Sequence, residues 1–148
     1  MIKEKHNNVL KGRMVANGKS QRPYYEKSET ASPTPHADSF MLTTAIEAYE
    51  RRHVGTGDVQ GAFSHAKEKD FTVIKFVNEQ VEIICKIDPE FKIHVVNEGR
   101  NKVICLMLNQ ALHGTLTAAL FWHELLTETL LKMDLNLTHV IFALQIAK

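Results

Sequence analysis

Apolar residues recur at helical spacing in two segments of the chain, residues 38–52 and residues 115–133. In the first segment, either Asp38 or Ser39 can cap a helix whose apolar positions then repeat every three or four residues. We predict that this helix ends near Arg52. The second segment predicts a longer helix, with these apolar residues on one side: Leu116, Ala119, Leu120, Leu126, Leu130 and Met133.

Between the two predicted helices the pattern changes to short runs that are rich in Val and Ile. Such runs are typical of strands, and short segments with turn residues separate them at hairpin distances. Because the strands follow one another instead of alternating with helices, the order predicts an α+β fold. The four expected strands are residues 71–77, 81–87, 91–96 and 102–108.

The N-terminal part of the chain has a weaker pattern. Residues 9–16 predict a short strand, and Asn17 with Gly18 predicts a turn because both residues tolerate a positive φ. Residues 20–37 hold three prolines and many Ser and Thr residues, so we expect a loop.

The composition fits one domain with a buried core. The chain has 148 residues, of which 44% are hydrophobic and 24% charged. We find no apolar run of the roughly 20 residues that a membrane helix needs, and no signal peptide at the N-terminus. The two cysteines, Cys85 and Cys105, are too few for a disulfide framework or a four-cysteine zinc site, so we expect an intracellular location and no membrane partner.

Basic residues are concentrated at the N-terminus, although the formal net charge is only +1. Residues 1–27 carry a net charge of +5, so the remainder carries −4. A basic segment of this kind can attract phosphates, and it is also typical of a solvated N-terminus without a ligand. The basic residues are Lys3, Lys5, Lys11, Arg13, Lys19, Arg22 and Lys27.

Two segments carry residues of the types that bind metal ions. His123 and Glu124 begin like a zinc-protease helix, but Thr127 stands where the second histidine would be needed. Asp58 follows Thr56-Gly57 and opens a segment with apolar flanks, which we expect to be the start of a strand. A carboxylate there suits Mg²⁺, whereas the alternative is that Asp58 only turns or caps the chain.

Four segments, in the same order, resemble the reverse transcriptase of copia-type LTR retrotransposons. KGRMVANGKSQR (11–22) is similar to the fingers segment, and SETASP (28–33) to the family's Glu-Thr-Phe-Ser-Pro. TGDVQGAF (56–63) resembles polymerase motif A, and LNQALHGTLTAALFW (108–122) the Leu-Tyr-Gly segment with its downstream Trp. The resemblance implies the fingers and an incomplete palm of a right-hand polymerase.

This resemblance also implies a division of the chain and a parent activity. Residues 1–137 would be the N-terminal part of the domain, with fingers at 1–37 and the start of the palm at 38–137. The parent activity is RNA-directed DNA synthesis, a nucleotidyl transfer with two Mg²⁺ ions. Its partners would be an RNA or DNA primer–template, dNTPs, and the rest of a retrotransposon polyprotein if that is present.

Particular residues take roles from the same resemblance. Asp58 would be the catalytic, metal-binding carboxylate of motif A. Phe63 matches the aromatic residue that lies under the sugar of the nucleotide. Lys11 and Arg13 would bind the triphosphate, and Gly114 would keep the backbone close to the template or the incoming base.

The chain also departs from the family pattern. Asn17 stands where the family has Lys, His113 where it has Tyr, and Thr117 in a segment that usually contains Gln. Motif C needs two adjacent aspartates, and no two aspartates are adjacent in this sequence. We therefore predict that the chain does not polymerise DNA.

The C-terminal residues match the family least. We interpret residues 138–148 as a tail without a counterpart in the family, produced by a frameshift near Leu137. Two alternatives to an enzyme fragment stay open: a non-catalytic nucleic-acid-binding remnant that uses the basic segment, and a non-functional pseudogene product.

Overall fold

The computed structural model divides the chain into two compact units, which are described separately. The first unit comprises residues 1–67 and 111–148, and the second comprises residues 68–110. The described residues are 2–4, 10–12, 14–53, 55 and 57–133. The predicted tail at 138–148 and Arg13 lie outside them.

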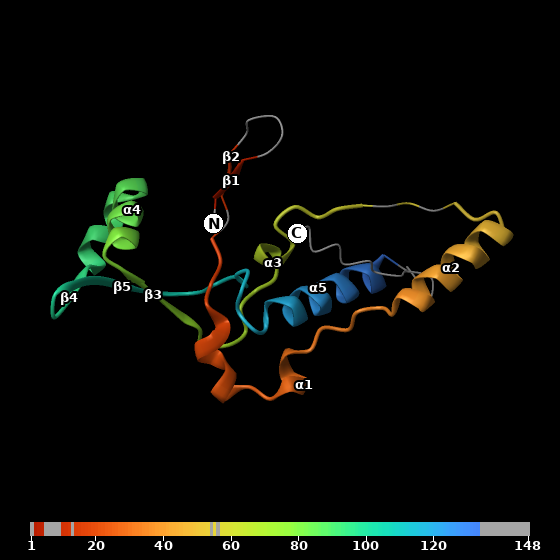
Figure 1. The fold of residues 1–148 in the computed structure, drawn as a ribbon, viewed down its shortest axis with the longest axis horizontal. Helices are drawn as coiled ribbons and strands as arrows, with labels where there is room; N and C mark the ends of the chain where they lie inside the picture. Colours follow the sequence, from red (N-terminus) through yellow and green to blue (C-terminus); the bar gives the residue numbers. More distant parts are fainter. Residues whose placement is uncertain (1, 5–9, 13, 54, 56, 134–148) are drawn as a thin grey trace. The chain divides into compact units, whose positions relative to one another are not determined.

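The first unit contains mainly helices (Figure 1). Strands β1 and β2 form an antiparallel pair, with Lys3 opposite Lys11. The elements are β1 (Ile2–Glu4), β2 (Leu10–Gly12), the 3₁₀ helix η1 (Gly18–Tyr24), α1 (Lys27–Thr30), α2 (Ala37–Tyr49), α3 (Ala62–His65) and α5 (Ala118–Lys132).

Both helices predicted from apolar spacing are present, as α2 and α5. The predicted cap of α2 is wrong, because His36 is the N-cap and its Nδ1 accepts a hydrogen bond of 3.4 Å from the backbone N–H of Asp38. Helix α5 buries Ala118, Phe121 and Trp122. The predicted apolar side is wrong, because its members are only half-buried or exposed: Leu116, Ala119, Leu120, Leu126, Leu130 and Met133.

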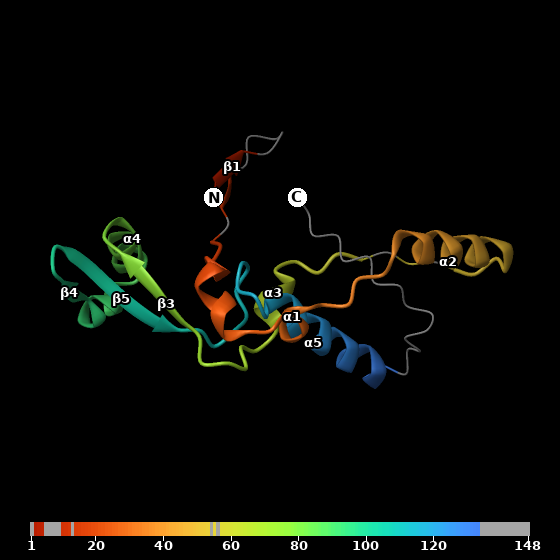
Figure 2. The same cartoon turned by 60° about the horizontal axis from the view of Figure 1, so that its bottom comes forward.

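A small apolar cluster joins α3 to α5, which lie side by side in Figures 1 and 2. Ala66 and Ala111 are connected by a backbone hydrogen bond of 2.9 Å from the N–H of Ala111 to the carbonyl of Ala66. The small side chains allow this close approach of the backbones. The cluster consists of Ala66, Ala111, Ala118 and Phe121, with Phe63 and Leu125 packed against it.

The N-terminal predictions are partly wrong. Strand β2 covers only three of the residues predicted at 9–16, and residues 14–17 are not in a strand. Asn17 is not a positive-φ turn residue: its φ is −93°, and its Oδ1 accepts a 3.1 Å hydrogen bond from the backbone of Lys19. This side-chain cap starts η1, so part of the predicted loop is helical.

The second unit is a three-stranded antiparallel sheet with strand order β3-β5-β4. Helix α4 lies beside β3 and β5 in both views (Figures 1 and 2). Val81 of α4 and Val103 and Ile104 of β5 form its buried interior. The elements are β3 (Val73–Val77), α4 (Glu79–Ile87), the 3₁₀ helix η2 (Pro89–His94), β4 (Val96–Glu98) and β5 (Asn101–Met107).

Two of the four predicted strands are wrong. Residues 81–87 lie in helix α4, and residues 91–94 belong to η2. A short apolar run is compatible with either a strand or a buried helical segment. Here Val81, Ile84 and Cys85 lie at helical spacing and are the less exposed positions, while Ile83 and Ile87 are exposed.

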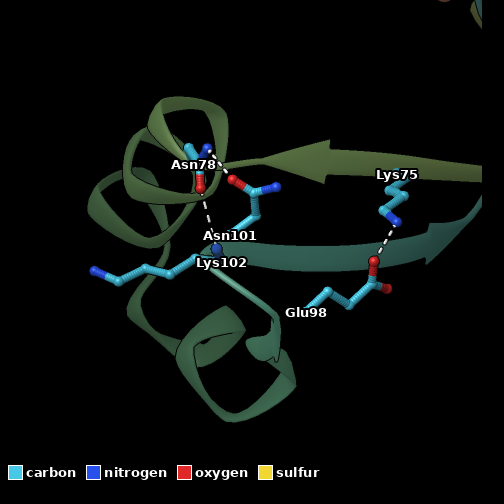
Figure 3. A network of polar contacts seen from close by, with 5 residues as sticks. All are labelled: Lys75, Asn78, Glu98, Asn101 and Lys102. Atoms are coloured by element: carbon cyan, nitrogen blue, oxygen red, sulfur yellow. Dashed lines mark hydrogen bonds and ion pairs between the residues drawn. The ribbon is translucent and has the colours of Figure 1, made fainter.

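Asn78 connects β3 to α4 through a network of polar contacts (Figure 3). Its Oδ1 accepts from the backbone N–H of Lys102 at 3.0 Å, and its Nδ2 donates to Asn101 Oδ1 at 2.8 Å. Nearby, Lys75 forms an ion pair with Glu98, and this carboxylate raises the pKa of Lys75. The network fixes the end of β3 to the start of β5.

We predict that Asn78→Ala destabilises the second unit. Asn78 has φ 50° and ψ −109°, a conformation that costs an alanine about 1 kcal/mol or more, and the two side-chain bonds contribute about 0.5–1.5 kcal/mol each. Hydrogen exchange at the Lys102 amide measures the effect and should become faster. Asn78→Gly removes the bonds but relieves the backbone, so a glycine variant less stable than the alanine variant would contradict this account.

Within the described part of the chain, no helix combines the length and the apolar character needed to cross a membrane.

Candidate functional site

Asp58 lies in an irregular, exposed segment that precedes α3. The prediction that it starts a strand is wrong, since the described residues after it form a turn at Gln60-Gly61 and then the short helix α3. Gly61 has φ 63°, and its carbonyl accepts a 2.7 Å hydrogen bond from Ser64 Oγ. This turn directs the chain from Asp58 into α3.

The described residues do not form a magnesium site around Asp58. A carboxylate is the right type of ligand for Mg²⁺, but a protein site normally uses more than one oxygen ligand. No group of three His, Cys, Asp or Glu side chains that could hold a metal ion occurs among the residues that the structure describes. Asp58 therefore stands as a single candidate ligand, and we assign no chemical step to a metal here.

Phe63 and His113 form a stacked pair. Phe63 comes from α3 and His113 from the loop before α5, and their ring centroids are 5.2 Å apart with an angle of 22° between the planes. Both side chains are half-buried. Of the predicted site residues, Phe63 is thus brought next to the segment that contains Gly114.

Gly114 is held against the N-terminal segment of the first unit. Its φ is 97°, and a Cβ built there would lie 2.2 Å from the carbonyl oxygen of Ala16. The backbone N–H of Ala16 donates a 2.7 Å hydrogen bond to the carbonyl of His113. This close approach within the chain gives a structural reason for glycine, in addition to the role in nucleotide binding that the family resemblance implies.

The predicted phosphate-binding residues are described only in part. Lys11 lies in β2, opposite Lys3 in the strand pair. Sequence reasoning missed Gln21, whose Oε1 accepts a 3.0 Å hydrogen bond from the backbone N–H of Leu116. No pattern along the chain could identify Gln21, because its partner lies 95 positions away.

Thr117 is the N-cap of α5 at the position where the family usually has a Gln-containing segment. It is only 2% exposed, and its side chain makes no capping hydrogen bond. Its Oγ1 is buried without a hydrogen-bond partner in the described part of the chain. The first turn of α5 also contains no acidic residue, so its positive end is not neutralised locally.

Glu68, in the second unit, has a partly buried carboxyl group. Desolvation by burial raises the pKa of Glu68, and its Oε2 has no hydrogen-bond partner among the described residues. Its Oε1 accepts from the backbone N–H of Asp70 at 3.4 Å. The folded state therefore disfavours the charged form of this side chain.

We predict that Glu68→Gln raises the melting temperature at about pH 7 and not at about pH 4. Because the folded pKa lies above the unfolded one, the carboxyl destabilises the fold as the pH rises from the unfolded pKa through the folded pKa. Below the unfolded pKa both states are protonated and the variant gains nothing. Thermal unfolding at the two pH values measures this, and Glu90→Gln, at an exposed position, is the control.

The family comparison assigns the chain to the polymerases that copy nucleic acid. A family model described as "Reverse transcriptase (RNA-dependent DNA polymerase)" matches residues 2–147. The chain belongs to this reverse transcriptase family, and the resemblance found in the sequence is confirmed at that level. The searches of curated proteins and of solved structures gave no match.

The matched range also bears on the C-terminal residues. It includes residues 138–147, which lie in the tail predicted to have no counterpart in the family. The frameshift near Leu137 stays a prediction. Sequencing the underlying DNA tests it, because a shifted frame downstream must encode the adjacent aspartates of motif C.

Proposed function

We propose that the chain provides the fingers and the start of the palm of a copia-type retrotransposon reverse transcriptase. We further propose that residues 1–148 by themselves bind nucleic acid without extending a primer. The observation that carries the proposal is the family match over residues 2–147. The subtype rests on the segments at 11–22, 28–33, 56–63 and 108–122.

The basic N-terminal segment supports nucleic-acid binding. Residues 1–27 carry a net charge of +5, and phosphate contacts by Lys and Arg release counterions from nucleic acid. Lys11 and Arg13 are the proposed triphosphate ligands, while Lys19 and Arg22 add positive charge from η1. Phe63, stacked on His113, is the proposed contact with the sugar of the nucleotide.

The absence of adjacent aspartates from residues 1–148 supports the proposal that these residues alone do not extend a primer. Two metal ions in a polymerase site are held by several carboxylates and stabilise both the attacking and the leaving oxygen. The sequence supplies Asp58 for motif A and has no pair of adjacent aspartates for motif C. One carboxylate cannot fix two ions at the separation that the chemistry requires.

Primer extension and duplex binding together test the proposal. The probe is an oligodeoxythymidine primer on a polyriboadenylate template, with dTTP and Mg²⁺, and the proteins are residues 1–148 and the Asp58→Ala variant. We expect no extension by either protein and salt-dependent binding of the labelled duplex by both. Extension that is lost in Asp58→Ala would overturn the inactivity, and affinity that does not change with salt would overturn the binding.

A non-functional product is the second candidate, and helix α2 favours it. No residue of α2 is buried, and the large apolar side chains Met41, Leu42 and Tyr49 are 68%, 64% and 89% exposed. An exposed apolar helix surface of this kind promotes aggregation. Light scattering of the purified chain separates the candidates, since a soluble, duplex-binding species excludes a product that only aggregates.

A further inference from the structure

Two segments far apart in sequence meet in the first unit, and we call their contact the glycine joint. It consists of residues 14–21, which lead into and include the start of η1, and residues 113–116, which precede α5. The hydrogen bond from the Ala16 N–H to the His113 carbonyl connects the two backbones at 2.7 Å. The joint therefore links the basic segment to the loop that carries His113.

The two glycines of the joint are packed against each other's segment. A Cβ on Gly18 would lie 2.5 Å from the carbonyl oxygen of Gly114, and a Cβ on Gly114 would lie 2.2 Å from the carbonyl oxygen of Ala16. Both contacts are with backbone atoms, which cannot move aside as a side chain can. Glycine at both positions therefore permits the short distance between the backbones of the two segments.

Gln21 adds the side-chain contact that closes the joint. Its Oε1 accepts from the backbone N–H of Leu116 at 3.0 Å, and this contact is partly buried. Gln21 lies between Lys19 and Arg22 in the sequence of η1. A bond at Gln21 therefore determines where these two cations are held relative to the start of α5.

The charges on the two segments favour an anionic ligand. Residues 5–25 contain five Lys and Arg residues and no Asp or Glu, and residues 111–123 contain no Asp or Glu either. The start of α5 adds the positive end of a helix without an acidic residue in its first turn. Neither residues 5–25 nor residues 111–123 therefore supply a carboxylate that could compete with a phosphate at the glycine joint.

We propose that Gln21 is a positioning residue for nucleic-acid binding. Through its bond to the Leu116 N–H, it holds Lys19 and Arg22 beside the His113 loop. These two cations then contact phosphates of the same nucleic-acid ligand that the loop contacts. The inference rests on the proposed function, because it assumes that the chain binds a nucleic-acid duplex. Gln21 itself does not contact the ligand in this proposal, and it acts by holding η1 in place.

A double-mutant cycle tests this role. Duplex affinity is measured over a range of salt concentrations for the wild type, Gln21→Ala, the double variant Lys19→Ala with Arg22→Ala, and all three changes together. Two phosphate contacts contribute about 1.8 to the slope of log affinity against log salt. In the wild-type background, we expect Lys19→Ala with Arg22→Ala to lower this slope by about 1.8. In the Gln21→Ala background, the same two changes should lower the slope by less than about a third of that amount.

Two further measurements separate positioning from loss of structure. Gln21→Glu keeps a hydrogen-bond acceptor, so hydrogen exchange at the Leu116 amide should be slow in Gln21→Glu and fast in Gln21→Ala. For duplex affinity, the matched control is Gln110→Ala, which changes an exposed glutamine. Fluorescence of the single Trp122, which is buried in α5, verifies the fold of each variant.

The outcomes distinguish the inference from the proposed function. Equal slope losses in the wild-type and Gln21→Ala backgrounds would overturn the positioning role and leave duplex binding intact. A wild-type chain that does not bind the duplex would overturn both. Slow exchange at Leu116 in Gln21→Ala would also count against the role, since the amide would then have another acceptor.

Discussion

Gly114→Ala is expected to lower the free energy of unfolding of the first unit by about 3 kcal/mol or more. Two effects add at this position. The backbone has φ 97°, which an L-residue with a Cβ rarely adopts, and the new Cβ would overlap the Ala16 carbonyl oxygen at 2.2 Å. Relief requires the backbones to separate, which breaks the Ala16–His113 hydrogen bond. Urea unfolding followed by Trp122 fluorescence measures the change.

Two other glycines of the same unit provide controls for this prediction. Gly61 has φ 63° and only Ser64 Oγ close to a built Cβ, at 3.1 Å, so Gly61→Ala measures mainly the cost of the backbone conformation. Gly55 has nothing within 4 Å of a built Cβ, so Gly55→Ala should change stability little. If Gly114→Ala proves no less stable than Gly61→Ala, the close approach at the joint is not part of the native fold.

Replacing four N-terminal cations by glutamine is expected to remove most of the duplex affinity. The positions are Lys11, Arg13, Lys19 and Arg22, which account for four of the seven basic residues in the first 27. If each contacts one phosphate, the slope of log affinity against log salt falls by about 3.6, which corresponds to a loss of more than about a hundredfold at low salt. Fluorescence polarisation of a labelled duplex measures both quantities.

A variant with the same change in net charge tests whether position matters. Lys67, Lys86, Lys92 and Arg100 are exposed and lie outside the basic segment. Their joint replacement by glutamine lowers the net charge equally, so we expect a much smaller change in slope. Equal slopes for the two variants would mean that only the total charge governs binding, and the N-terminal segment would lose its proposed role.

The elements predicted best are those whose pattern is long or buried on one face. Helix α5 was predicted because apolar residues recur over four turns, although its most buried side chains, Phe121 and Trp122, do not belong to the apolar side that was predicted. Strand β5 was predicted from its Val and Ile content, and it buries Val103 and Ile104. Helix α4 was missed because the seven residues 81–87, which mix apolar and charged side chains, fit both the strand and the helix period.

The candidate site was predicted through the family resemblance more than through spacing. Asp58 was identified from motif A, whereas its local structure is an exposed irregular segment and not the start of a strand. Phe63 was given a role toward a ligand, and the structure adds its stacking on His113. This pair joins positions 50 residues apart, which no local pattern connects.

The sequence by itself determined the family, the two main helices, two strands of the sheet and the concentration of basic charge. These properties follow from local periodicity, motif order and residue type, which neighbouring positions encode. Tertiary structure alone decided that Gly18 and Gly114 approach each other and that Gln21 binds Leu116. The physical reason is that each contact depends on the distance between backbones almost a hundred residues apart, and that distance is set by how the intervening chain folds.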